Sequence, residues 1–222
     1  MAIAFGSAVD GGNATATSLT FAFNNVAGDI VFVGGVGDST TDDVTGATYN
    51  GVAMTLVDKL TPGGINNRWS YLFYLVAPAT GSNNVVVSAS GSHFLGFGAV
   101  SYTGASQTGV PDATNKQSGG AAITTLTTSV TTIADNCWTV LLENSYSLDS
   151  LPFAGTGATR RTTDNTFGTW GLFDSNAAIT PAGGYSMQTN RDIGVTTIDH
   201  VMASFKPAGG VTAKPYYYFR NQ

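Results

Sequence analysis

Residues 18–33 read SLTFAFNNVAGDIVFV and contain two strand patterns on either side of a turn. In the first pattern, Leu19, Phe21 and Phe23 alternate with small or hydroxyl-bearing side chains, which gives an extended strand one apolar face. In the second, every residue from 30 to 33 is apolar, as in a central strand buried on both faces. Asn, Gly and Asp between them favour a turn. The stretch therefore predicts two strands, the second in the middle of a sheet.

Similar signals recur along the rest of the chain. Asn50-Gly51 lies between two strand-like pieces, and this pair suits a type I′ hairpin because both central residues of that turn need positive φ. No long stretch shows the 3.6-residue period of a helix. Segments bounded by Gly, Pro and Asn predict strands over residues 69–76, 85–90, 95–102, 123–131, 137–144, 169–174, 185–188 and 195–205.

Many short strands with Gly- and Asn-rich turns predict an all-β fold, an antiparallel two-sheet sandwich. A jelly-roll-like topology is preferred because two packed sheets limit exposed edges, and a closed barrel with more even strand spacing is the alternative. A chain of 222 residues can form one such domain with a substantial core. The pattern breaks at Pro207, so we predict a sandwich over residues 1–206 and a linker with an extended arm over residues 207–222.

The predicted arm carries four consecutive aromatic residues, Tyr216, Tyr217, Tyr218 and Phe219. Exposed apolar patches of this kind usually mark interaction sites. Two alternatives stay open, since the arm can fold back onto its own domain or dock on a neighbouring subunit. We predict that these four residues make the contacts most relevant to function.

The composition excludes some classes of partner. Only 10% of the residues are charged, against about 25% in an average soluble domain, and hydroxyl and amide side chains fill the polar positions. A net charge of −5 and a pI near 4.6 argue against binding nucleic acid, which needs clustered Lys and Arg. No apolar run is long enough to cross a membrane, and residues 1–6 do not form a signal peptide. We therefore expect synthesis in the cytoplasm and release by lysis or assembly.

Candidate catalytic groups are few. His93, expected at a turn, and His200 show no metalloprotease spacing, and there is no Gly-x-Ser-x-Gly motif. Glu143, the only glutamate, follows an apolar strand and is interpreted as a solvated strand end. Cys137 is the only cysteine, so the chain has no intramolecular disulfide, and we interpret this residue as a small buried hydrophobe. We expect no enzymatic activity and no cofactor.

Two binding sites are considered as minor candidates. Asp38, Asp42 and Asp43 share one loop and could supply oxygen ligands to calcium, although their spacing does not match an EF-hand and a solvated turn is the simpler interpretation. Trp170, flanked by Gly168 and Gly171, is the best candidate for an exposed platform on which a sugar ring stacks. Trp69 and Trp138 lie in apolar runs and are predicted to be core residues.

Several short stretches carry a resemblance to a known group of proteins. These are residues 49–52 (YNGV), 102–107 (YTGASQ), 111–114 (PDAT) and 199–207 (DHVMASFKP). In these stretches the chain resembles the β-sandwich structural proteins of tailed bacteriophage particles, which decorate capsids or build tails and fibres. The general character of the sequence is similar to theirs over most of residues 45–207. The resemblance implies a jelly-roll-like homo-oligomer in the virion, in contact with copies of itself and other virion proteins. The alternative function is a glycan-binding module or adhesin of a fibre or cell surface.

Overall fold

The computed structural model describes residues 1–61, 68–120, 122–145, 150–164, 166, 169–195 and 197–209. These residues form an all-β, antiparallel fold, as the sequence predicts. None of them belongs to a helix that could span a membrane. The strands are β1 (Ala4–Asn25), β2 (Ile30–Asp38), β3 (Val44–Tyr49), β4 (Val52–Ala53), β5 (Thr55–Leu60), β6 (Arg68–Val76), β7 (Gly81–Thr103), β8 (Ala113–Ser118), β9 (Ile123–Thr131), β10 (Trp138–Ser145), β11 (Phe153–Ala154), β12 (Thr159–Thr163), β13 (Trp170–Asp174), β14 (Gly184–Val195) and β15 (Ile198–Phe205).

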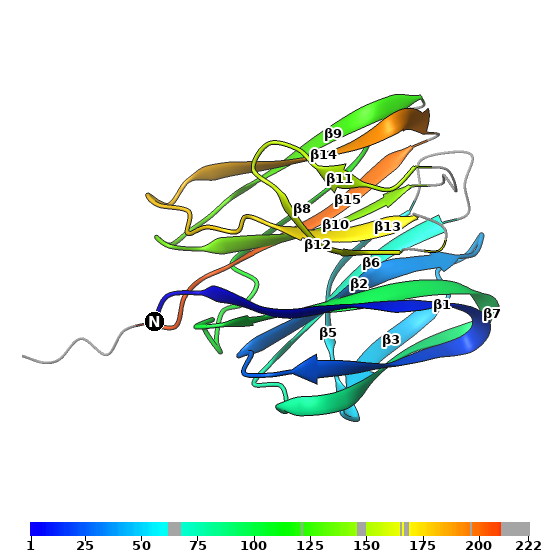
Figure 1. Cartoon of the computed structure of the whole chain (residues 1–222), viewed down its shortest axis with the longest axis horizontal. Coiled ribbons are helices and arrows are strands. Elements are labelled where there is room, and N and C mark those ends of the chain that lie inside the picture. The colour runs from blue at the N-terminus through cyan, green and yellow to red at the C-terminus, as the bar shows by residue number, and fades with distance from the viewer. Residues whose placement is uncertain are drawn as a thin grey trace, which may run out of the picture.

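The described strands form three sheets that stack as layers (Figure 1). The large sheet has the order β4-β3-β7-β2-β6-β5, with β1 also paired to β7. The middle sheet has the order β12-β13-β10-β15-β8, and the small sheet the order β11-β14-β9. The predicted sandwich class is therefore confirmed, but a third sheet covers the face of the middle sheet that a two-sheet sandwich would leave in water.

A long two-stranded ribbon of β1 and β7 organises the large sheet. Its pairing runs from Ala4 opposite Thr103 to Asn25 opposite Gly81. The other side of β7 pairs with β3 near its start and with β2 near its end. The sequence predicts two strands here, over residues 85–90 and 95–102, but the backbone stays extended between them and forms one strand.

Burial on both faces explains the apolar run in β2. Phe32 and Val36 face the core between the large and middle sheets, whereas Val31 and Val33 face a second core inside the large sheet. In the middle sheet, Leu141 faces the small sheet, and its neighbours in β10 face the large sheet. A strand enclosed by two layers has no solvent face, and its sequence is apolar at successive positions.

The predicted hairpin at Asn50-Gly51 is confirmed. Tyr49 pairs with Val52, and Asn50 and Gly51 have φ values of 50° and 75°. These left-handed conformations are the ones that a type I′ turn requires and that Asn and Gly tolerate. The hairpin is a local feature that its own residues specify.

The first and last described residues meet at one end of the molecule (Figure 1). The Met1 nitrogen donates a hydrogen bond to the carbonyl of Ala208 at 3.2 Å. The Ala208 amide donates in turn to the carbonyl of Gly104 at 2.7 Å, and Pro207 forms an isolated bridge with Ala105. The chain is therefore still attached to the end of β7 after β15 has finished, and it leaves the described structure at this end.

Candidate functional site

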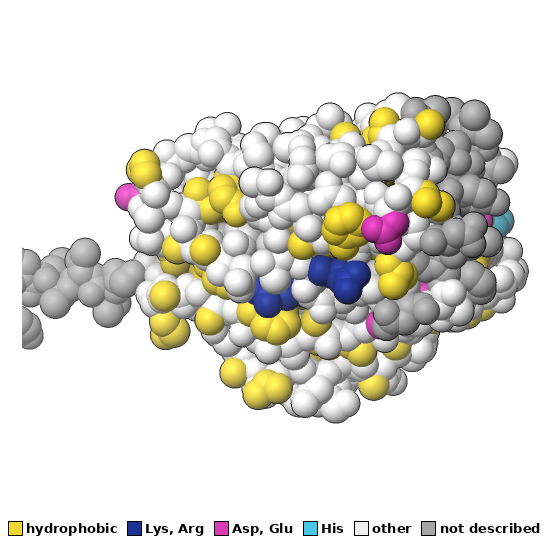
Figure 2. Space-filling model, turned by 45° about the horizontal axis from the view of Figure 1, so that its top comes forward, with side chains coloured by type: hydrophobic (Ala, Val, Ile, Leu, Met, Phe, Trp, Pro, Cys, Tyr) yellow, Lys and Arg dark blue, Asp and Glu magenta, His cyan; other side chains and the backbone are white. Residues whose placement is uncertain are grey.

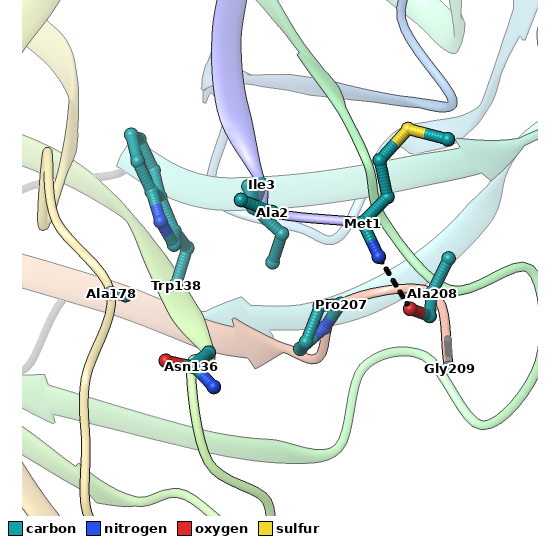
Figure 3. A pocket seen from close by; sticks show the side chains of 9 residues that line it. All are labelled: Met1, Ala2, Ile3, Asn136, Trp138, Ala178, Pro207, Ala208 and Gly209. Atoms are coloured by element: carbon teal, nitrogen blue, oxygen red, sulfur yellow. Dashed lines mark hydrogen bonds between the residues drawn. The ribbon is translucent and has the colours of Figure 1, made fainter. Parts of the chain in front are cut away.

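An open, mainly apolar pocket, here called the end pocket, lies where these two chain segments meet (Figure 3). Its volume is about 520 Å³, which is within the usual range for binding pockets. Figure 3 shows the Trp138 indole on one side, Met1 and Ala208 on the other, and Ile3 and Pro207 between them. The pocket is lined by Met1, Ala2, Ile3, Asn136, Trp138, Ala178, Pro207, Ala208 and Gly209.

A buried aromatic cluster fixes the Trp138 side of the pocket. Trp138 is the first residue of β10, and its indole packs edge-on against Tyr102 with ring centroids 5.8 Å apart. Tyr102 is fully buried and also packs against Phe205 at 4.9 Å. Large rings held on both sides by core packing have little freedom to move. The Trp138 side is therefore a preformed surface.

Two loops joined by backbone hydrogen bonds form the neighbouring wall of the pocket. Asn136 has a φ of 62°, and its backbone N–H donates a hydrogen bond to the carbonyl of Ile179 at 2.8 Å. The Ile179 amide donates to the carbonyl of Cys137 at 2.8 Å, which joins the turn before β10 to the loop after β13. Ala178, on that loop, is exposed and faces the pocket. Among the lining side chains, Asn136 carries an amide and Trp138 an indole N–H, and the others are apolar or absent.

The surface around the end pocket is unusually apolar for exposed positions. Met1, Ile133 and Val26 are 81%, 68% and 66% exposed, the largest values among the exposed large hydrophobic side chains of the described residues. Met1 lines the pocket, Ile133 lies in the turn that leads to Asn136, and Val26 lies in the turn between β1 and β2. The end pocket and these three side chains are here called the end face. Figure 2 shows hydrophobic side chains at this end of the molecule, among others that are scattered over the visible face.

Trp170 is not an exposed platform, so that prediction is wrong. Its side chain is fully buried between the large and middle sheets. Two glycines of β7 make room for it, because a Cβ at Gly96 would lie 3.0 Å from the indole nitrogen and one at Gly98 would collide with the ring. The flanking glycines in the sequence suggested exposure, but the indole packs against glycines of another strand. Trp138 is buried as predicted, and Trp69 is half-buried.

The three loop carboxylates do not converge on a shared site, which contradicts the calcium hypothesis. No cluster of three or more His, Cys, Asp or Glu side chains within the described ranges could hold a metal ion. Each carboxylate instead has partners of its own, which satisfy its charge or its lone pairs. Asp38 pairs with Arg68 at 3.4 Å, Asp42 with Lys59 and with the Tyr71 hydroxyl at 2.9 Å, and Asp43 with His93 at 2.9 Å, Ser90 at 2.9 Å, Thr41 at 3.0 Å and Ser39.

The two histidines are in strands. His93 lies within β7, paired with Ala16, and not at a turn as the sequence suggested. His200 is fully buried between the middle and small sheets, with one ring nitrogen 2.9 Å from the Thr128 hydroxyl and the other 2.8 Å from that of Thr189. Burial lowers the pKa of His200 to about 3, and the positive charge of Arg191 acts in the same direction. His200 is therefore neutral at physiological pH.

Glu143 is not a solvated strand end; it is fully buried. It forms an ion pair with Arg191 of β14 at 2.8 Å, and both side chains have no exposed surface. Burial raises the pKa of Glu143, while the charge and hydrogen bond of Arg191 oppose this rise. The misassignment has a clear cause: the period of β10 points Glu143 away from the large sheet, and the third sheet that covers this face was not predicted.

The Cys137 prediction is confirmed, since the side chain is a buried free thiol. Its sulfur donates to the Asp112 carboxylate at 3.2 Å and to the Ala134 carbonyl at 3.0 Å. Burial and the neighbouring carboxylate raise its pKa to about 12. A thiol with such a pKa is a poor nucleophile, so Cys137 acts as a packing residue.

A second, polar hollow of about 450 Å³ lies beside the β3–β4 hairpin, away from the end pocket. Its side chains carry hydroxyls and amides, and none is ionisable. Such groups can exchange hydrogen bonds with an uncharged polar ligand. The hollow is lined by Thr48, Asn50, Gly51, Ser82, Asn83, Asn84 and Val86.

The predicted contact residues Tyr216, Tyr217, Tyr218 and Phe219 lie outside the described residues. The last described residue before them, Gly209, is part of the rim of the end pocket. No protein-family model matches the chain, and no curated protein is significantly similar to it.

Proposed function

We propose that the chain is a non-enzymatic structural subunit of a virus particle, a capsid-decorating or tail-associated protein of the kind found in tailed bacteriophages. In this proposal it is made in the host cytoplasm, assembles as a homo-oligomer, and contacts copies of itself and other virion proteins. The end face is the observation that best supports a role in contacts with other proteins. An open apolar pocket and the most exposed hydrophobic side chains coincide at the end where the chain leaves the sandwich. Large exposed apolar surface usually marks a protein interface.

The use of the polar core supports the same conclusion. Glu143, Arg191 and His200 are enclosed between the middle and small sheets. Glu143 of β10 pairs with Arg191 of β14, and His200 of β15 forms hydrogen bonds with hydroxyls of β9 and β14. Groups held in this way link the small sheet to the middle sheet and have no route to a substrate. They make the sandwich a rigid support for a contact surface.

A jelly-roll-like topology remains part of the proposal. In the middle sheet, β10 lies between β13 and β15, and β15 lies between β10 and β8. Neighbouring strands thus come from distant parts of the chain, as in the Greek-key connections from which jelly rolls are built. The virion location rests on the resemblance of residues 102–107 and 199–207 to phage structural proteins.

The test is the physical state of the protein in its native source. A lysate is separated on a density gradient, and the chain is located with an antibody. We expect it to sediment with large symmetric particles or fibres and to stay with them after nuclease treatment. Recovery of the chain only as a free, low-mass protein would contradict the proposal.

A glycan-binding module is the second candidate, and the polar hollow beside the hairpin favours it. Asn50, Asn84 and Ser82 are exposed there and can bond to sugar hydroxyls. A glycan array compares the wild-type chain with Asn84→Ala. Binding that the substitution abolishes would favour this candidate, whereas an array without hits would remove it.

A further inference from the structure

We propose that the end pocket of one copy receives aromatic side chains from residues 216–219 of a second copy, so that two chains exchange their C-terminal segments. This inference rests on the proposed function as an assembling subunit, and it names the partner of the end face.

The reach of the chain permits such an exchange. Residues 210–222 follow Gly209, which lies on the rim of the pocket. An extended chain spans at most about 3.3–3.6 Å per residue, so Tyr216 can lie up to roughly 25 Å from Gly209. This is enough to cross from the end of one sandwich to the end of another that faces it.

The chemistry of the pocket suits an aromatic ring with a polar tip. Ile3, Trp138 and Pro207 offer apolar surface, and the Asn136 amide lies on the lining. Aromatic rings pack favourably edge-on or offset against an indole, and a tyrosine hydroxyl needs a hydrogen-bond partner when it is buried. Tyr216, Tyr217 and Tyr218 carry both of these groups.

The alternation of side chains points to a second copy. In an extended segment, Tyr216 and Tyr218 face one way while Tyr217 and Phe219 face the other. Docking on the segment's own sandwich would bury one of these faces. In the proposed exchange, one face enters the pocket and the other meets the remaining surface of the second copy.

The exposed part of the end face gives the second aromatic face a surface to meet. Met1 lines the pocket, Ile133 lies in the turn that leads to Asn136, and Val26 lies in the turn between β1 and β2; all three are mostly in water in the single chain. Asp135, exposed beside Asn136, adds a negative charge on the same side, and the aromatic segment is flanked by Lys214 and Arg220. The apolar and the charged parts of the segment thus both have complementary groups on the end face.

The size of such an interface is sufficient. An aromatic side chain buries about 150–250 Å². Four of them bury roughly 600–1,000 Å², and reciprocal exchange doubles this area to roughly 1,200–2,000 Å², which is the size of a standard stable interface. Exchange of identical segments between two copies also gives a closed, symmetric dimer.

The experiment uses full-length variants and light scattering over a range of concentrations. Ala178→Glu places a carboxylate in the pocket of an otherwise intact chain, and Ala177→Glu is the matched control, because Ala177 is also exposed but does not line the pocket. A third variant replaces Tyr216, Tyr217, Tyr218 and Phe219 by Ser. We expect the wild type and Ala177→Glu to be dimers. Ala178→Glu should weaken dimerisation by at least about 30-fold, as when an interface hot spot is lost.

A mixture of two variants tests the direction of the exchange. The Ala178→Glu chain has a blocked pocket and an intact segment, whereas the serine variant has an intact pocket and no aromatic segment. Each should be monomeric alone, and the two together should form a one-to-one complex. Trp138 lines the pocket, so its fluorescence should change in the mixture and not in either variant alone.

Two results would overturn the inference. One is a wild-type chain that stays monomeric at all concentrations, which would mean that the segment returns to its own pocket or binds elsewhere. The other is a wild-type dimer that survives Ala178→Glu unchanged. Neither result bears on gradient sedimentation, which tests the proposed function separately. A chain that sediments with particles but is monomeric in solution keeps the function and loses the exchange.

Discussion

At the scale of single residues, the buried polar groups determine how the sheets are held together. Glu143 on β10 and Arg191 on β14 connect the middle sheet to the small sheet through one ion pair. Taking two charges out of water is costly, and the pair is tolerated only because each charge compensates the other. Removing one partner leaves the other buried without its main compensation.

We therefore expect Glu143→Gln to lower the free energy of unfolding by about 3–5 kcal/mol. Urea unfolding followed by circular dichroism measures this change. Lys59→Ala is the control, because it removes the half-exposed ion pair with Asp42 and should cost no more than about 1 kcal/mol. Equal losses in the two variants would mean that the Glu143 pair is not shielded from solvent.

Two other buried groups oppose each other as the pH changes. The pKa of His200 falls from 6.5 to about 3 on folding, so its contribution to stability is complete above pH 6.5 and is lost as the pH falls towards 3. Burial raises the pKa of Asp199 from 3.8 to about 6, against a hydrogen bond from Ser118. The contribution of Asp199 is complete below pH 3.8 and is lost as the pH rises towards 6.

Asp199→Asn should therefore make the protein more sensitive to acid. With this carboxyl removed, the His200 contribution, on the order of 4 kcal/mol, is lost between neutral pH and about pH 4 without the compensation that Asp199 provides in the wild type. Urea unfolding at a series of pH values in this window compares the slope of the variant with that of the wild type. Adding His200→Gln should flatten the slope again, and a slope that His200→Gln does not change would assign the acid sensitivity to another group.

At the scale of elements, the sequence predicts strands where apolar residues alternate or run together, and it misses strands that contact water. β8 and β12 consist mainly of polar residues, β5 mixes polar residues with Leu and Val, and all three lie at the edges of their sheets. The first half of β1, with Asp10, Gly11 and Gly12, has no strand pattern either. It is extended because it pairs with β7. Pairing of this kind is a tertiary effect that local propensity does not record.

The contact between β7 and β13 gives a test at this scale. A Cβ at Gly98 would collide with the Trp170 indole, so Gly98→Ala should destabilise the fold by about 1–3 kcal/mol. Gly46→Ala in β3 is the matched control, since nothing lies within 4 Å of its added Cβ. Thermal unfolding of both variants measures the difference. A neutral Gly98→Ala would show that the two sheets can separate locally at no cost.

At the scale of the whole molecule, the end pocket could not be predicted because its parts are distant in sequence. Its walls come from residues 1–3, 136, 138, 178 and 207–209. None of these stretches has a pattern that relates it to the others. The break in pattern at Pro207 is the only feature of the pocket that the sequence indicates, and it marks the position where the chain leaves the sandwich. The third sheet escaped prediction for a similar reason, since β9 and β14 alternate like strands of any sandwich.

The sandwich and the C-terminal segment should have separate roles, the first in folding and the second in assembly. All strands and core clusters of the described residues lie within residues 1–209, so we expect deletion of residues 211–222 to leave the thermal unfolding of the sandwich monomer unchanged. The same deletion should abolish assembly, because it removes all four aromatic side chains proposed to make the contact. Calorimetry of the truncated chain at low concentration and its sedimentation beside the full-length chain measure the two effects. Assembly that persists after the deletion would assign the contacts to the sheet faces and edges, whereas unfolding of the truncated chain would make the segment part of the domain.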